Sequence, residues 1–250
     1  MVIERAFHFF GGARCWMADG LRIPRRGRVL EVGYGQGLFT AELAERAKDG
    51  CVSAVDFHSG RVTTGPTRSA LRHLHLLDKV ELVTGEATKL PFRNTMHDCA
   101  ASFLGFQDIE ISRGNGGVYS ALQEMCRVVK PGGNVAIADD CFPECRPGGD
   151  QGRLFDAMRK HWHTLLPSIQ TFASTLQQGG VAGISVMEFE PGEWIPPTEA
   201  ERELRLAVEW AKPQGILVDF DAFWREAETI VRKEGRRFSK VIVIGGRKTG

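Results

Sequence analysis

Three glycines at alternating positions constrain the fold of this chain more than any other stretch. They are Gly33, Gly35 and Gly37, which follow the apolar run 29–32 and precede a helical pattern that starts at Leu38. Glycine lets the backbone adopt a positive φ and lets a ligand approach where a Cβ atom would block it, and the first turn of a helix offers unpaired N–H groups. We therefore predict a strand, a tight turn and a helix that bind a cofactor through the backbone of these glycines.

The spacing of the glycines and one acidic residue indicate which cofactor this is. Dinucleotide sites prefer Gly-x-Gly-x-x-Gly, whose last gap leaves room for a pyrophosphate at the helix N-terminus. Here Gly37 comes one residue early, and Glu31, two positions before the turn, would repel a pyrophosphate but attract an ammonium group. Both features favour S-adenosylmethionine (SAM) over NAD. The ring of Tyr34, between the glycines, is placed to contact the sulfonium or to shield the methionine end.

The balance of charges argues against nucleic acid as a partner. The chain has 250 residues, enough for one sizeable core, and carries 32 basic and 31 acidic side chains. No apolar run approaches the roughly 20 residues that span a bilayer, and the first residues lack the layout of a signal peptide. We expect a soluble cytoplasmic protein, and the sequence leaves its oligomeric state open.

Six scattered cysteines give no tight metal-binding pattern. Cys141 and Cys145 could be grouped with His161 and His163, but this spacing matches no zinc template and lies beside a loop rich in Pro and Gly. In an intracellular protein such cysteines are reduced and buried. We therefore expect no metal site.

Alternating strand and helix patterns predict a parallel sheet. Strands are expected at 29–32, 51–56, 80–84, 96–104 and 134–139, and helices at 38–48, 71–77 and 122–129, the second delayed by a Gly-Pro pair at 65–66. Parallel strands need right-handed crossovers, and their ligands bind at the carboxyl ends of the strands.

The end of the second strand supplies two candidate cofactor contacts. Asp56 stands 19 positions after Gly37, at the tip of a strand beside the glycine turn, where a carboxylate can accept both hydroxyls of a ribose. Its alternative role is that of a helix N-cap. Phe57 follows it and is placed to lie against an adenine ring.

The ends of the next two strands complete the predicted cofactor site. Glu86 and the backbone of Ala87 follow the third strand and can read the amino group and a ring nitrogen of adenine. Ser102 and Phe103 end the fourth strand, so we expect them at the same edge of the sheet.

Together these motifs resemble the class I SAM-dependent methyltransferases, and within them the type 11-like group of ubiquinone and menaquinone biosynthesis. The resemblance covers about residues 27–140: the glycine turn, the ribose carboxylate Asp56, the adenine loop 85–92 and the helix and turn 122–133. It implies an α/β, three-layer, doubly wound Rossmann-like fold with a seven-stranded sheet, mostly parallel, whose last strand is antiparallel. Residues 184–189 and 240–244 supply two late strands.

Two of the three stretches outside the resemblance, 141–178 and 196–235, are expected to determine the substrate, within a single domain of residues 1–250. Residues 1–27 are interpreted as a lid or an edge segment, with Phe7 and Phe9 among their apolar residues. Residues 141–178 and 196–235 are interpreted as helical cap insertions at the ligand edge of the sheet.

Methyl transfer from a sulfonium is an in-line displacement that needs alignment, a dry pocket and few special side chains. A general base is needed only if the acceptor must lose a proton. His161, His163 and Asp139 are the candidate catalytic residues, followed by Asp140 and Asp108, although only one of the two histidines can face the substrate from a helix.

The sequence therefore predicts a SAM-dependent methyltransferase that acts on a small-molecule acceptor by O-, N- or C-methylation. The alternatives are a methyltransferase of a protein or RNA, a non-catalytic SAM-binding subunit, and an NAD-dependent oxidoreductase. The glycine spacing and Glu31 disfavour the last of these.

Overall fold

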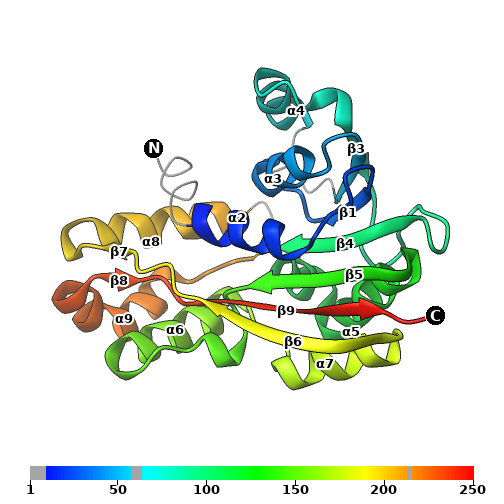
Figure 1. Cartoon of the computed structure of the whole chain (residues 1–250). Coiled ribbons are helices and arrows are strands. Elements are labelled where there is room, and N and C mark those ends of the chain that lie inside the picture. The colour runs from blue at the N-terminus through cyan, green and yellow to red at the C-terminus, as the bar shows by residue number, and fades with distance from the viewer. Residues whose placement is uncertain (1–9, 58–63, 213–215) are drawn as a thin grey trace.

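A seven-stranded sheet lies at the centre of the computed structural model, which describes residues 10–57, 64–212 and 216–250. The strand order is β3-β2-β1-β4-β5-β9-β6. The first five strands are parallel, whereas β9 runs antiparallel to both β5 and β6. The predicted fold class is thereby confirmed (Figure 1). The strands are β1 Arg28–Val32, β2 Cys51–Asp56, β3 Val80–Thr84, β4 His97–Phe103, β5 Val129–Asp139, β6 Val181–Phe189 and β9 Val241–Lys248.

Helices cover both faces of the sheet because its strands are apolar on both sides. Successive residues point to opposite faces, so Val29 packs into the cluster under one helix layer and Leu30 into the cluster under the other. The first layer consists of α2 Gly11–Gly20, α3 Leu38–Arg46 and α4 Thr64–His73, and the second of α5 Phe106–Val128 and α7 Ile169–Gln178. The short 3-10 helices are η1 Leu77–Lys79 and η2 Pro143–Cys145.

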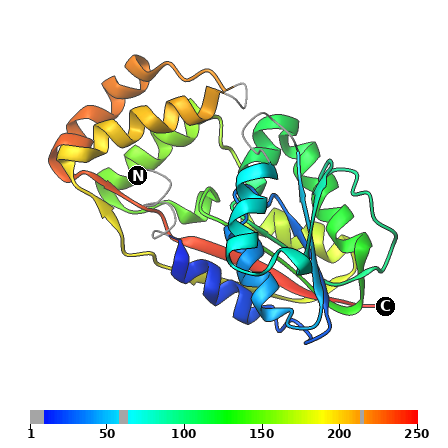
Figure 2. The ribbon, with the colours of Figure 1, turned by 90° about the horizontal axis from the view of Figure 1, so that it is seen from above.

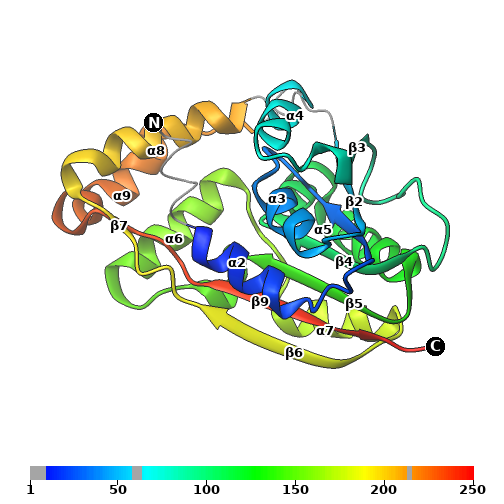
Figure 3. The same cartoon turned by 45° about the horizontal axis from the view of Figure 1, so that its top comes forward.

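A third apolar cluster joins three helices that do not cover the sheet. These are α6 Gly149–Trp162, α8 Pro197–Ala211 and α9 Phe220–Glu234, which pack around the fully buried Phe223 and Leu204. The antiparallel pair of β7 Trp194–Ile195 and β8 Arg236–Arg237 lies where the chain enters and leaves α8 and α9. Figures 1, 2 and 3 show the three helices gathered to one side of the sheet, beyond the end of β5. We call them the α6/α8/α9 unit.

Several elements differ from their predicted bounds, among them β5, which begins at Val129 and not at residue 134. The helix before β5 begins at Phe106 and is interrupted at Gly114, where φ is 64° and ψ is −174°. Helix α4 contains the Gly-Pro pair at 65–66, because proline is tolerated in a first helical turn. Of the predicted cap segment 141–178, only α6 joins the α6/α8/α9 unit, since Phe172 of α7 packs on Phe106 of the sheet layer.

Buried His97 makes the stability of this sheet depend on pH. Burial lowers the pKa of His97 to about 4, and the nearby Arg28 adds to this effect. Because the unfolded chain binds the proton near pH 6.5, stability is complete above that pH and is lost as the pH falls toward 4. We expect the free energy of unfolding in urea to be about 2 kcal/mol lower at pH 5 than at pH 7 through this residue.

A His97→Leu variant should remove that share of the pH dependence, while His73→Gln, at an exposed position of α4, should leave it unchanged. Equal pH dependence in the wild type and His97→Leu would contradict the assignment.

Candidate cofactor and acceptor site

The glycine turn has the backbone conformation that its sequence predicts. Gly33, Gly35 and Gly37 have φ values of 79°, 49° and 80°, in the left-handed region that favours glycine. A Cβ atom at Gly37 would lie 2.6 Å from Cγ2 of Thr67, so α4 closes on the turn at that point. The Thr67 hydroxyl donates to the carbonyl of Gly35 at 3.2 Å. The conformation of the turn is therefore held by its contacts with α4 as well as by its own φ angles.

Asp56 lies at the tip of β2, beside the turn. Its Oδ2 accepts the backbone N–H of Gly35 at 2.7 Å, so the carboxylate holds the turn and also stands next to it. Asp56 is partly buried and is the last residue of β2. This position suits the predicted contact with a ribose.

Arg113 joins the two predicted adenine contacts, and sequence reasoning missed it. Its guanidinium lies 5.1 Å from the ring centroid of Phe57, which is 47% exposed, and donates to Oε1 of Glu86 at 2.6 Å. Ala87 packs on the core next to this group. Arg113 precedes the Gly114 interruption of α5, and the only signal for it was that glycine inside a helical stretch.

Four buried oxygen atoms around β1 and β4 have no hydrogen-bond partner within the described residues. They are Glu31 Oε2, Tyr34 OH, Thr40 Oγ1 and Ser102 Oγ. Such orphan groups are costly unless a ligand or water satisfies them. A ligand with an ammonium group, like the methionine end of SAM, donates the hydrogen bonds that a buried carboxylate lacks. The residues present therefore fit the predicted cofactor.

Two predicted aromatic contacts lie in the core on the α2 and α3 face. Tyr34 is 3% exposed and belongs to the same cluster as Phe39. The ring of Phe103 lies 5.4 Å from that of Phe39 and 6.3 Å from that of Phe10. Both rings form a wall behind the glycine turn, and their contact with the cofactor stays a prediction.

Glu31 is expected to couple cofactor binding to proton release. Burial raises its pKa to about 8, the neighbouring charge of Asp56 raises it further, and the hydroxyl of Thr40 opposes both. The free protein therefore holds this carboxyl protonated near pH 7. A bound ammonium favours the carboxylate, so we expect binding of SAM to release a proton and its affinity to rise between about pH 5.5 and 7.5.

Calorimetry in buffers of different ionisation enthalpy measures this proton directly. Glu31→Gln should bind without releasing it and with a flat pH profile. Wild-type binding with no proton release in any buffer would contradict the role of Glu31.

A cavity of about 380 Å³ opens beside the glycine turn. A Cβ atom at Gly33 would lie 3.2 Å from Cα of Gly105, and the preceding Leu104 lines the cavity, so the turn and the cavity share a wall. The opposite wall comes from the α6/α8/α9 unit and β8, with Trp162, Glu203 and Arg236. Most of the lining side chains are apolar, as in pockets that bind small molecules.

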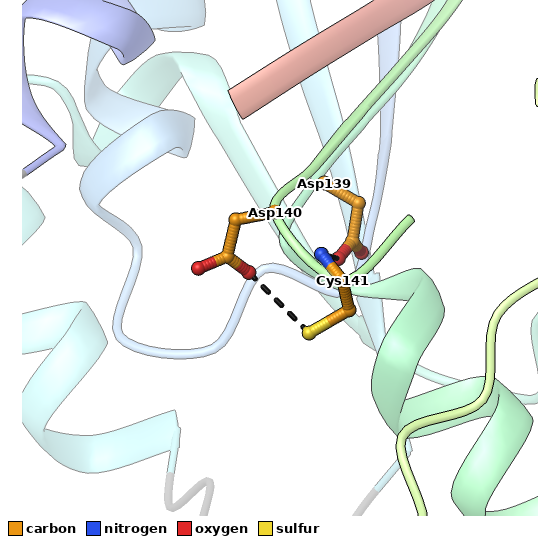
Figure 4. Close-up of side chains that lie close together, drawn as sticks. All are labelled: Asp139, Asp140 and Cys141. Carbon is orange, nitrogen blue, oxygen red and sulfur yellow. Dashed lines mark hydrogen bonds between the residues drawn. The ribbon is translucent and has the colours of Figure 1, made fainter. Parts of the chain in front are cut away.

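Asp139 ends β5, and the two residues that follow it, Asp140 and Cys141, line this cavity. Figure 4 shows the three side chains close together. Asp139 is fully buried, and its two oxygens accept the backbone N–H groups of Gln107 at 3.3 Å and of Cys141 at 3.0 Å. The Cys141 thiol lies 2.9 Å from Oε1 of Gln107 and 3.4 Å from Oδ1 of Asp140. Asp139 thus shapes the floor, whereas Asp140 and Cys141 line the cavity.

Burial gives these acidic groups unusual protonation. It raises the pKa of both Asp139 and Asp140, and their proximity raises that of Asp139 further. The pKa of the Cys141 thiol lies well above its ordinary value for the same reasons. Donor atoms of the three residues lie within 4.8 Å of one another, but Asp139 and Cys141 already use theirs in hydrogen bonds to the protein. A buried carboxyl of raised pKa in a cavity suits proton transfer.

The two predicted catalytic histidines lie outside the cavity lining. His161 is on α6 and places Nε2 3.1 Å from Oε1 of Glu226, while its ring contacts that of Phe223. Helix α6 ends at Trp162, so His163 is the C-cap in a left-handed conformation, with a φ of 56°. Trp162, between them, lines the cavity instead. Asp108, also predicted, lines the cavity at the start of α5.

Comparison with known proteins places the central region in one family. A model of the methyltransferase domain matches residues 29–133. Demethylmenaquinone methyltransferase of Paenarthrobacter aurescens is 29% identical over 136 residues, which cover 53% of this chain and 47% of that protein. The ubiquinone/menaquinone biosynthesis C-methyltransferase UbiE of Erwinia tasmaniensis is 29% identical over 164 residues, which cover 64% of this chain and 60% of that protein. The match thus spans about half the length of these relatives.

Solved structures share the fold along nearly the whole chain. The YcgJ protein of Bacillus subtilis superposes with a TM-score of 0.63 at 16% identity, over 96% of this chain and 99% of that one. Geranyl diphosphate methyltransferase in complex with SAM has a TM-score of 0.58 at 12% identity, over 93% of this chain and 85% of that one. At these identities the likeness establishes the fold alone.

Proposed function

We propose that this chain is a class I SAM-dependent methyltransferase that moves a methyl group from SAM to a small-molecule acceptor. One observation carries the proposal. The glycine turn that suits the cofactor packs closely on Gly105, and the preceding Leu104 lines the 380 Å³ cavity that suits an acceptor. An in-line displacement requires such neighbouring sites, because nucleophile and methyl group must be aligned at contact distance.

Each predicted cofactor residue has a role that its position supports. Gly33, Gly35 and Gly37 admit the cofactor to the backbone, and Asp56 holds its ribose. Glu31 balances the ammonium group. SAM supplies an electrophilic methyl group when bound.

At the adenine end, Glu86 and Ala87 read the base and Phe57 lies against it, with Arg113 positioning Phe57 and Glu86. Tyr34, Ser102 and Phe103 complete the wall behind the turn.

Asp140 is the side chain that we propose as general base when the acceptor must lose a proton. It lines the cavity, while the oxygens of Asp139 are occupied by backbone N–H groups. Its raised pKa brings it closer to neutral pH, where a base is most effective. Asp139 then acts as a positioning residue, because it fixes Gln107 and Cys141 on either side of Asp140.

The helices α6, α8 and α9 serve as the acceptor cap in this proposal, and α2 with Phe10 closes the cavity from the N-terminal side. Residues 1–9 of the predicted lid lie outside the described part of the chain. No helix in the described ranges is long and apolar enough to cross a membrane. We also propose a cytoplasmic location, which the six free cysteines support.

Two measurements test the function. Calorimetry with SAM and with NAD should give binding of SAM alone, and tight binding of NAD without SAM would reject the proposal. Incubation of the protein and labelled SAM with fractionated cell extract should transfer label to a small molecule. Label in protein or RNA would instead identify a macromolecular acceptor, and no label in any fraction despite SAM binding would indicate a non-catalytic subunit.

A further inference from the structure

Arg236 is a charged side chain of the cavity that forms no ion pair within the described residues. It lines the cavity from β8, and its guanidinium lies 4.8 Å from the ring centroid of Phe238, which lines the same wall. Within the described ranges this guanidinium forms neither an ion pair nor a hydrogen bond to a side chain. Arg236 is partly buried, and burial lowers its pKa. A desolvated cation of this kind is costly unless an anion meets it.

Of the other arginines that line the cavity, one forms side-chain hydrogen bonds and one is exposed to solvent. Arg159 donates to the carbonyl oxygens of Thr164 at 3.0 Å and Leu166 at 3.4 Å, where it closes the end of α6. Arg237 is exposed, and its backbone N–H donates to Gln151. Arg236 is thus the partly buried lining arginine whose guanidinium N–H groups have no side-chain acceptor within the described residues. The planar guanidinium matches the two oxygens of a carboxylate.

Two carboxylates influence Arg236 from opposite walls without pairing with it. Asp140 lies on the floor at the end of β5, and Glu203 lies on α8 of the α6/α8/α9 unit. Burial raises the pKa of Asp140, and its charge raises the pKa of Arg236. Glu203 contacts Arg202 at 3.8 Å.

We propose that Arg236 binds a carboxylate group of the methyl acceptor, an inference that rests on the proposed methyltransferase function. The acceptor then has an apolar body that contacts Leu104 and Trp162, a carboxylate at Arg236 and a protic nucleophile near Asp140. A single negative charge fits this site, because Asp140 and Glu203 would repel the second charge of a phosphate more strongly. The carboxylate binds at Arg236 of β8 and the nucleophile lies near Asp140, which follows β5, so one ligand spans the cavity between them.

Matched ligands that differ only in the end group test this assignment. The probes are benzoate, phenylacetate and 4-hydroxyphenylacetate, each beside its primary amide, with tyramine and phenyl phosphate as amine and phosphate arms. Binding is measured by calorimetry on protein saturated with S-adenosylhomocysteine. We expect at least one acid to bind about tenfold or more tightly than its amide. Arg236→Gln should abolish that preference, and Arg236→Lys should retain part of it.

Arg205→Gln is the matched control, because Arg205 lies on α8, pairs with Glu201 and stays outside the cavity lining. It should keep the preference for acids. Thermal melts of all three variants confirm that they fold. Equal binding of every acid and its amide, tighter binding of tyramine or phenyl phosphate, or an acid preference that survives Arg236→Gln would each overturn the proposal.

This experiment distinguishes a loss of SAM binding from the absence of a carboxylate site at Arg236. SAM binding is measured first and alone, so its loss would reject the methyltransferase function. Normal SAM binding with no acid preference would reject only the role of Arg236.

Discussion

An Asp56→Ala variant is expected to bind SAM at least about tenfold more weakly than the wild type, because it loses two contributions at once. The carboxylate is placed to accept the ribose hydroxyls, and it accepts the N–H of Gly35 at 2.7 Å, which fixes the turn that the cofactor must approach. Hydrogen bonds to charged groups contribute about 1.5–3 kcal/mol each. Calorimetric titration with SAM measures the change.

Two further variants separate these contributions. Asp56→Asn keeps an oxygen for Gly35 but loses the charge, so it should lose part of the affinity. Asp49→Ala removes a partly exposed carboxylate that pairs with Arg25, on the loop between α3 and β2, and should bind SAM like the wild type. Unchanged affinity in Asp56→Ala would remove the ribose role.

An Asp140→Asn variant is expected to slow methyl transfer by about 10²- to 10⁴-fold while SAM affinity stays unchanged. The amide retains the size of the carboxyl but cannot accept a proton. Because the pKa of Asp140 is raised by burial, the wild-type rate should rise with pH as this group ionises, and the variant should lose that limb of the profile. The assay is transfer of labelled methyl to the acceptor found by extract fractionation.

The matched control for this prediction is Asp156→Asn, at an exposed position of α6 where Asp156 pairs with Arg146. It should transfer methyl groups at the wild-type rate. A wild-type rate and pH profile in Asp140→Asn would mean that the acceptor needs no base here, or that another group supplies it.

The glycine turn and the end of β2 could be predicted because they are built from local sequence. A strand, a turn and the following helix lie within a few residues of one another, so the positive φ angles at Gly33, Gly35 and Gly37 follow from their spacing. The strand β2 has its predicted bounds for the same reason, and Asp56 lies where its last position places it.

The acceptor half could not be predicted because its residues come from distant segments. Arg236 belongs to a two-residue strand with no hydrophobic period, and Glu203 lines the same cavity from α8, a distant segment of the chain. The end of α6 was also not predicted from the sequence. The sequence suggested a helix through His163, whereas the chain leaves the helix at Trp162, so the tryptophan and not a histidine lines the cavity.

The position of β9 also orders the assembly of the protein. This strand is the last in sequence of those described, yet it lies between β5 and β6 and pairs with both. While the chain is being synthesised, β5 has an open edge and β6 has no partner until residues 241–248 have emerged. Pairing between strands that are far apart in sequence costs loop-closure entropy before the contacts between them can stabilise the sheet. A chain truncated before residue 241 should retain the parallel half with its glycine turn, but expose a strand edge that invites aggregation.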